Sequence, residues 1–129
     1  MSVGIVVVTH GRTGSAMLAE AEFILGQDLK AVERVAFDHS EDHTAGIVAI
    51  HEAIEKVDGG NGVIVLTDLI GASPSNRVSV LLEHYDAVMV TGVNLAMLIS
   101  VWNYRERALG MLARKAVEAG RKGIKIIQK

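Results

Sequence analysis

The sequence predicts a single doubly wound α/β domain with a mostly parallel sheet, and three observations lead to this fold class. Apolar, β-branched runs alternate with segments of helical periodicity along the whole chain. Strands this apolar are typical of a parallel sheet that helices cover on both faces. The 129 residues are 50% hydrophobic and contain no linker or repeat, so one domain over residues 1–129 is expected.

Five strands are expected from the apolar runs. They are Val3–Thr9, Ala31–Phe37, Gly62–Thr67, Ala87–Thr91 and Gly123–Ile127. The second run carries Glu33 and Arg34 and the last carries Lys125, so these two are expected at the edges of the sheet. The other three runs are uncharged, as buried central strands should be. The predicted order is therefore 2-1-3-4-5, with a short antiparallel last strand.

Five helices are expected between these strands. They are Thr13–Leu25, Ala45–Val57, Ser73–His84, Asn94–Trp102 and Glu106–Ala119. Gly26 and Gly120 suit the C-terminal ends of the first and last helix, because glycine readily adopts the left-handed conformation found there. Ser73 is expected to cap the third helix, with Pro74 at its first helical position.

Composition excludes several classes of function. The absence of cysteine excludes disulfides, thiol catalysis and zinc bound by cysteine. A formal charge of −2 and few aromatic side chains argue against a nucleic-acid partner. The apolar run Val3–Val8 is too short to span a bilayer or to form the core of a signal peptide. We therefore expect a cytoplasmic protein without direct membrane insertion.

The chemistry is expected where the strand order reverses, beyond the carboxyl ends of the first and third strands. The first strand leads into His10 and Gly11, and the third leads into Asp68, Gly71 and Ser73. A neutral histidine is a nucleophile, and a carboxylate on its other ring nitrogen would fix the tautomer. A helix N-terminus capped by Ser73 suits a phosphoryl group, and the two glycines allow close backbone approach.

Each of these residues also has a purely structural explanation. A histidine after a strand is often a loop residue, and an aspartate there is commonly a turn residue. Ser73 is fully explained as the start of a helix. The functional hypothesis depends on the convergence of His10, Asp68 and Ser73 at one switch point, which predicts a histidine that accepts and donates phosphoryl groups.

Three stretches of the sequence carry a resemblance to a known family: GIVVVTHG near the start, GVIVLTDLIGASPSN in the middle and VTGVNLAMLIS further on. Together they resemble the enzyme IIA domain of the mannose family of the bacterial phosphoenolpyruvate-dependent sugar phosphotransferase system. The resemblance runs from Val3 to the C-terminus. The Thr-His-Gly and Asp-x-x-Gly-x-Ser-Pro-x-Asn strings are fairly specific in combination.

The resemblance implies that His10 is phosphorylated by the phosphocarrier protein HPr, on the ring nitrogen distal to the backbone, and passes the group to a separate enzyme IIB. It implies a hydrogen bond from Asp68 to this histidine and a phosphate pocket that contains Ser73, with no cofactor. It also implies a homodimer that exchanges the final strand. Arg12 departs from the aromatic residue familiar at this place. A contact with phosphate is one interpretation, but a position at the partner surface or a solvated side chain is favoured. The role is either in sugar uptake or in a regulatory phosphorelay.

Three alternatives remain open. The related phosphotransfer subunit of a dihydroxyacetone kinase shares the fold and the histidine. A nucleotide-binding module is suggested by the glycines after the first strand, although the Walker lysine and the GxGxxG spacing are missing. The segment Asp38–His43, with His51 beyond it, has nitrogen and oxygen ligands of the right kind for a metal. Its acidic residues are better explained as the start of a helix, so no metal site is expected.

Overall fold

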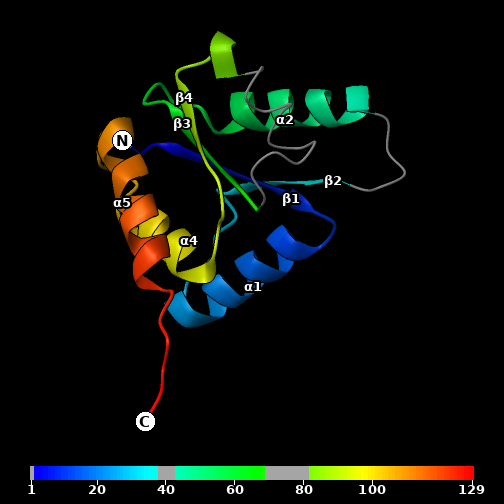
Figure 1. Cartoon of the computed structure of the whole chain (residues 1–129). Helices are drawn as coiled ribbons and strands as arrows, with labels where there is room; N and C mark the ends of the chain where they lie inside the picture. The colour runs from blue at the N-terminus through cyan, green and yellow to red at the C-terminus, as the bar shows by residue number, and fades with distance from the viewer. Residues whose placement is uncertain (1, 38–42, 69–81) are drawn as a thin grey trace.

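The structure, a computed structural model, describes residues 2–37, 43–68 and 82–129 (Figure 1). The elements of these ranges are β1 (Gly4–His10), α1 (Thr13–Leu25), β2 (Glu33–Phe37), α2 (His43–Val57), β3 (Val63–Thr67), the 3-10 helix η1 (Leu82–His84), β4 (Ala87–Val90), α4 (Leu95–Asn103) and α5 (Leu109–Lys122). The α/β class is as predicted. The bounds agree with the expected ones to within two residues, except that α5 begins and ends three residues later than expected.

The four strands form one parallel sheet in the order β2-β1-β3-β4 (Figure 1). This is the predicted order of the first four strands. In the centre of the sheet, Gly4 pairs with Val63 and Val8 pairs with Thr67. β1 and β3 therefore end side by side, which brings the residues that follow them to one place at the carboxyl edge.

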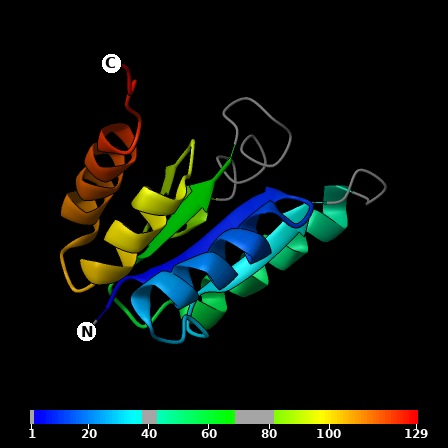
Figure 2. The same ribbon diagram turned by 90° about the horizontal axis from the view of Figure 1, so that it is seen from below.

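Helices cover both faces of the sheet and enclose an apolar core on each. α1, α4 and α5 lie on one face and α2 lies on the other (Figures 1 and 2). Side chains of successive strand residues point to opposite faces, so Val7 and Ile64 belong to the first core and Val6 and Val65 to the second. All four are completely buried. β1 and β3 are thus buried on both sides, as predicted, whereas the prediction of a buried central strand is wrong for β4, three of whose four residues are only partly buried at the edge of the described sheet.

The start and end of α1 have clear local causes. The Gly14 N–H donates to Thr9 Oγ1 at 2.7 Å, which ties the first turn of the helix to the end of β1. A Cβ on Gly14 would lie 2.8 Å from that hydroxyl oxygen, so glycine permits the close approach. At the other end, Gly26 has φ +65° and its N–H donates to the Glu22 carbonyl oxygen. The predicted end of this helix at Gly26 is confirmed.

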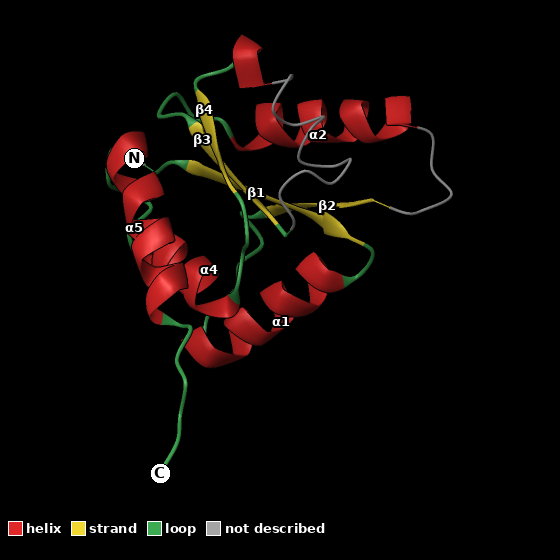
Figure 3. Ribbon diagram, viewed as in Figure 1, coloured by secondary structure: helices red, strands yellow, loops and turns green. Residues whose placement is uncertain are grey.

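The C-terminal end of the chain differs from the prediction. α5 continues through Gly120 to Lys122, because Gly120 is buried against α4, where a Cβ would lie 2.9 Å from Met97 Cε. The glycine serves helix packing there and does not end the helix. The predicted fifth strand, Gly123–Ile127, is not formed: the chain after α5 is a loop in the described structure and runs away from the sheet (Figures 1 and 3). The predicted fifth strand is therefore not confirmed, and the sheet of the described residues has four strands.

Most of the predicted helix Ser73–His84 lies outside the described residues, and its last three residues form the 3-10 helix η1. The acidic segment Asp38–His43 also lies outside them, apart from the backbone of His43 at the start of α2. Among the described helices, none has the length and apolar character needed to cross a membrane.

Candidate functional site

His10 and Asp68 meet at the carboxyl edge of the sheet. His10 is the last residue of β1 and Asp68 directly follows β3. The register Val8↔Thr67 leaves each of them just beyond the last pair of the two central strands. The sequence prediction that these two side chains face one another agrees with the structure.

One carboxylate oxygen of Asp68 holds both the ring and the backbone of the histidine. Asp68 Oδ2 lies 3.0 Å from His10 Nδ1 and accepts a hydrogen bond from the His10 backbone N–H at 2.9 Å. An ionised carboxylate only accepts hydrogen bonds, so Nδ1 carries the proton in this contact. In the neutral ring the lone pair then resides on Nε2, the nitrogen distal to the backbone.

The histidine side chain of this pair is more exposed than the carboxylate. The His10 side chain is 32% exposed, whereas that of Asp68 is 17% exposed. A protein partner or a ligand can therefore reach the ring, while the carboxylate is partly shielded from water. Shielding strengthens the interaction of the carboxylate with a positive charge that develops on the ring.

Two further contacts fix the backbone around the pair. The Gly11 N–H donates to the Phe37 carbonyl oxygen at 3.0 Å, and Gly11 has φ +47°, a conformation that favours glycine. The Val93 N–H donates to the Thr67 carbonyl oxygen at 2.9 Å, directly before Asp68. Because its N–H is already engaged, a phosphate-binding role for Gly11 would rest on close approach and not on donation.

The remaining predicted site residues, Gly71 and Ser73, lie outside the described residues, so their phosphate-binding roles stay predictions. Sequence reasoning missed Thr9, whose buried hydroxyl positions the start of α1 next to His10. The available signal was a single polar side chain directly before the histidine at the end of an otherwise apolar run.

A second group of polar side chains lies away from this edge. His51 Nδ1 is hydrogen-bonded to the Tyr85 hydroxyl, and His51 Nε2 lies 3.2 Å from Glu55 Oε1. Burial, and to a lesser extent the charge of Glu55, raises the pKa of Tyr85. These contacts connect α2 to the residue that follows η1. Within the described ranges, no group of three metal-ligating side chains comes together.

The fold and the pair at its edge define a class of protein: a doubly wound α/β domain with an accessible histidine whose ring is held by a carboxylate. The family model described as "PTS system fructose IIA component" matches residues 4–117. The chain therefore belongs to this family, the mannose-type enzyme IIA proteins of the phosphotransferase system, which are phosphotransferases. The resemblance seen in the sequence is confirmed.

Individual relatives agree with this assignment. The chain is 33% identical to the PTS system mannose-specific EIIAB component of Escherichia coli (strain K12) over 133 residues, which cover 99% of this chain and 40% of that protein. The chain thus spans less than half the length of this relative. Component EIIA from Streptococcus agalactiae is 26% identical, with a TM-score of 0.86 over 96% of both chains.

The fold is also that of the mannose/sorbose specific IIA subunit from Enterococcus faecalis. The TM-score is 0.90 at 22% identity, over 100% of this chain and 97% of the other.

Proposed function

We propose that this chain is a phosphohistidine relay in which His10 accepts a phosphoryl group from phosphorylated HPr and passes it to an enzyme IIB. The observation that carries the proposal is the 3.0 Å contact between His10 Nδ1 and Asp68 Oδ2. Membership of the family supplies the phosphotransfer chemistry, and this contact supplies an oriented, accessible histidine to perform it. Transport of a sugar and a regulatory phosphorelay both use this same transfer.

The transfer follows from the orientation of the ring. The lone pair on Nε2 attacks the phosphorus as the phosphorus–nitrogen bond of the donor breaks, and the donor histidine keeps that electron pair. The His10 ring gains positive charge as the new bond forms, and the Asp68 carboxylate at Nδ1 stabilises it. When the acceptor attacks in turn, the bond to Nε2 breaks and its electron pair returns to the ring. No proton needs to leave Nδ1 in either step.

Ser73 and Gly71 belong to the same proposal as the groups that hold the phosphoryl oxygens. Family resemblance supports this role, together with the short sequence distance from Asp68 to Ser73. Backbone N–H groups and a hydroxyl at the start of a helix are suited to bind such an anion. Substitution of Ser73 by alanine is expected to slow the transfer and to leave the labelled residue unchanged.

Labelling with phosphoenolpyruvate, enzyme I and HPr tests the proposal. The His10→Ala protein should take up no acid-labile phosphate. The matched control is His84→Ala, which removes an exposed histidine of η1 and should be labelled like the unchanged protein. Acid-labile label on the His10→Ala protein would refute the assignment of His10.

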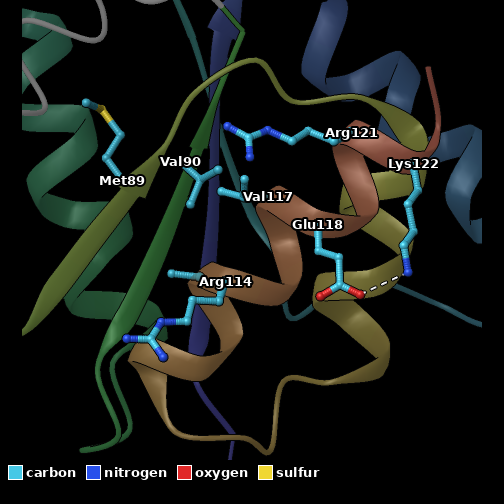
Figure 4. Close-up of a pocket in the computed structure, with 8 residues that line it drawn as sticks. Met89, Val90, Arg114, Val117, Glu118, Arg121 and Lys122 are labelled. Atoms are coloured by element: carbon cyan, nitrogen blue, oxygen red, sulfur yellow. Dashed lines mark hydrogen bonds and ion pairs between the residues drawn. The ribbon is translucent and has the colours of Figure 1, made fainter. Parts of the chain in front are cut away.

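The proposal includes a homodimer that exchanges the C-terminal segment. Ile124, Ile126 and Ile127 are 76%, 88% and 86% exposed, which is unusual for three isoleucines so close together. Beside the outer edge of β4, a cavity of about 580 Å³ opens between this strand and α5 (Figure 4). Apolar side chains, among them Met89 and Val117, form part of its wall. Because an unpaired strand edge attracts another strand, this edge suits the terminal segment of a second copy.

Sedimentation tests the exchange of the terminal segment. A chain ending at Gly123 retains all of α5 and loses the three isoleucines. It should sediment as a monomer at concentrations where the full chain is dimeric. A chain ending at Ile127, which keeps the three isoleucines, is the matched control and should remain dimeric. A dimer of the shorter chain would show that the main contact lies elsewhere.

A further inference from the structure

The outer face of α1 carries apolar side chains that no part of the described structure covers. Arg12, Ala16, Ala19 and Phe23 follow one another at intervals of four, three and four residues, so they share one face of the helix. All four are exposed, and Phe23 is 86% exposed. Ile24, beside Phe23, is 57% exposed. We call the surface formed by these five residues the α1 outer face.

This face begins beside the reacting histidine. Arg12 is two residues beyond His10, separated from it only by the turn at Gly11. α1 lies on the outside of its layer and starts at the carboxyl end of β1 (Figures 1 and 2). From Arg12 to Phe23 the helix rises about 16 Å.

A protein that transfers a phosphoryl group to His10 must cover the surface around the ring, because the two reacting atoms come into contact. A standard interface occupies about 800 Å² of each partner, a patch roughly 30 Å across. An interface that includes His10 therefore extends readily along the α1 outer face as far as Phe23.

The charge at the near end of this face suits a phosphorylated partner. The Arg12 side chain forms no hydrogen bond or ion pair within residues 2–37, 43–68 and 82–129. The first turn of α1 contains no acidic residue, and the N-terminus of a helix adds partial positive charge. A phosphohistidine on the partner brings a doubly negative group to this place. Glu20 lies within the α1 outer face, four residues from both Ala16 and Ile24, and is about 12 Å along the helix from Arg12, so its charge is remote from the phosphoryl group.

We propose that the α1 outer face is the docking surface for the phosphorylated donor protein, with Arg12 beside the phosphoryl group and Phe23 as the apolar anchor at the far end. The proposal rests on the proposed function, since it takes phosphorylated HPr as the partner. Arg12 recognises the donor while the donor carries the negative charge, and this preference ends once the group has moved to His10. Phe23 contributes equally to binding of the phosphorylated and the unphosphorylated donor.

Transfer kinetics with phosphorylated HPr at varied concentration test this surface. Arg12→Ala and Phe23→Ala should each raise the KM for phosphorylated HPr about tenfold, as truncation of an arginine or aromatic side chain that carries binding energy does at protein interfaces, with kcat within about twofold. The effect of Arg12→Ala should shrink as salt is added, because exposed charges are screened, whereas that of Phe23→Ala should persist. The matched controls are Arg34→Ala on β2 and Val48→Ala on α2, which remove an exposed cation and an exposed apolar side chain elsewhere.

A KM within about twofold of the unchanged value for either Arg12→Ala or Phe23→Ala overturns the proposal, as does an equal rise in the two controls. If Phe23→Ala weakens the dimer in sedimentation and leaves KM unchanged, a second copy covers this face and the proposal is wrong. Failure of the docking proposal is distinct from failure of the relay, because labelling of His10 and its loss in His10→Ala do not depend on the value of KM.

Discussion

Replacement of Asp68 by asparagine isolates the charge of the carboxylate at the site. The substitution keeps the size of the side chain and one oxygen that can accept from the His10 backbone N–H, now 2.9 Å from Asp68 Oδ2. The fold and the position of the ring should therefore persist. What is lost is the negative charge 3.0 Å from Nδ1, where the ring becomes positive during transfer.

The size of the effect follows from the geometry. A hydrogen bond to a charged group contributes about 1.5–3 kcal/mol. The partial exposure of both side chains, 32% for His10 and 17% for Asp68, excludes the much larger values of a dry interior. Since each 1.36 kcal/mol is a tenfold change in rate, transfer to His10 should slow by about 10- to 150-fold. A larger loss would mean that the amide group turns its NH2 toward Nδ1 and moves the ring proton to Nε2.

Rapid-quench labelling with an excess of phosphorylated HPr measures this rate, and thermal unfolding checks the fold. The matched control is Asp58→Asn, because Asp58 also accepts a backbone hydrogen bond, from the Gly60 N–H at 2.9 Å, in an exposed turn. The control should transfer at the unchanged rate. If Asp68→Asn transfers within about twofold of the unchanged protein, the carboxylate gives no electrostatic support and Asp68 is only a turn residue.

Two further substitutions probe the framework around the site. Gly14→Ala places a Cβ 2.8 Å from the Thr9 hydroxyl and should lower the free energy of unfolding by about 1–3 kcal/mol in denaturant titration, whereas Gly110→Ala, in open space, should not lower it. The raised pKa of Tyr85, caused by burial and then by Glu55, means that the folded state holds the phenol proton more tightly than the unfolded state. Its contribution to stability is complete below pH 10 and is lost as the pH rises through the higher folded value, so stability should fall less steeply above pH 10 in Tyr85→Phe. An equal slope in both proteins would contradict this.

The uncharged strands were the most predictable part of the fold, because burial on both faces leaves a clear mark on composition. β4 shows where this reasoning is limited. Its residues Ala87–Val90 are uncharged like those of a central strand, yet β4 is an edge of the described four-stranded sheet. The absence of charged residues predicts that a strand is covered by other residues. It does not predict whether those residues belong to the same chain or to a second copy. The proposed exchange of the terminal segment would account both for the uncharged edge of β4 and for the exposed isoleucines at 124, 126 and 127.

The end of α5 could not be predicted for a different reason. A glycine near the end of a helix can adopt the left-handed conformation that stops it, as Gly26 does, or allow a neighbouring helix to approach, as Gly120 does. The two roles look alike in the sequence, because the distinction depends on whether Met97 lies opposite. The exposure of Arg12 could not be predicted for the same reason. It depends on how α1 packs in the folded protein and not on the residues next to Arg12 in the sequence.

The contact of His10 with Asp68 was predictable because it depends on strand register and not on loop conformation. The five pairs from Gly4↔Val63 to Val8↔Thr67 leave both site residues just past the end of the ladder. A slip of one residue would turn every side chain of β1 to the opposite face, which the two apolar cores strongly disfavour. The geometry of the pair is therefore set by the burial of strand residues far from the chemistry. Gly71 and Ser73 are further along the chain from the ladder and lie outside the described residues, and strand register gives no prediction for their positions.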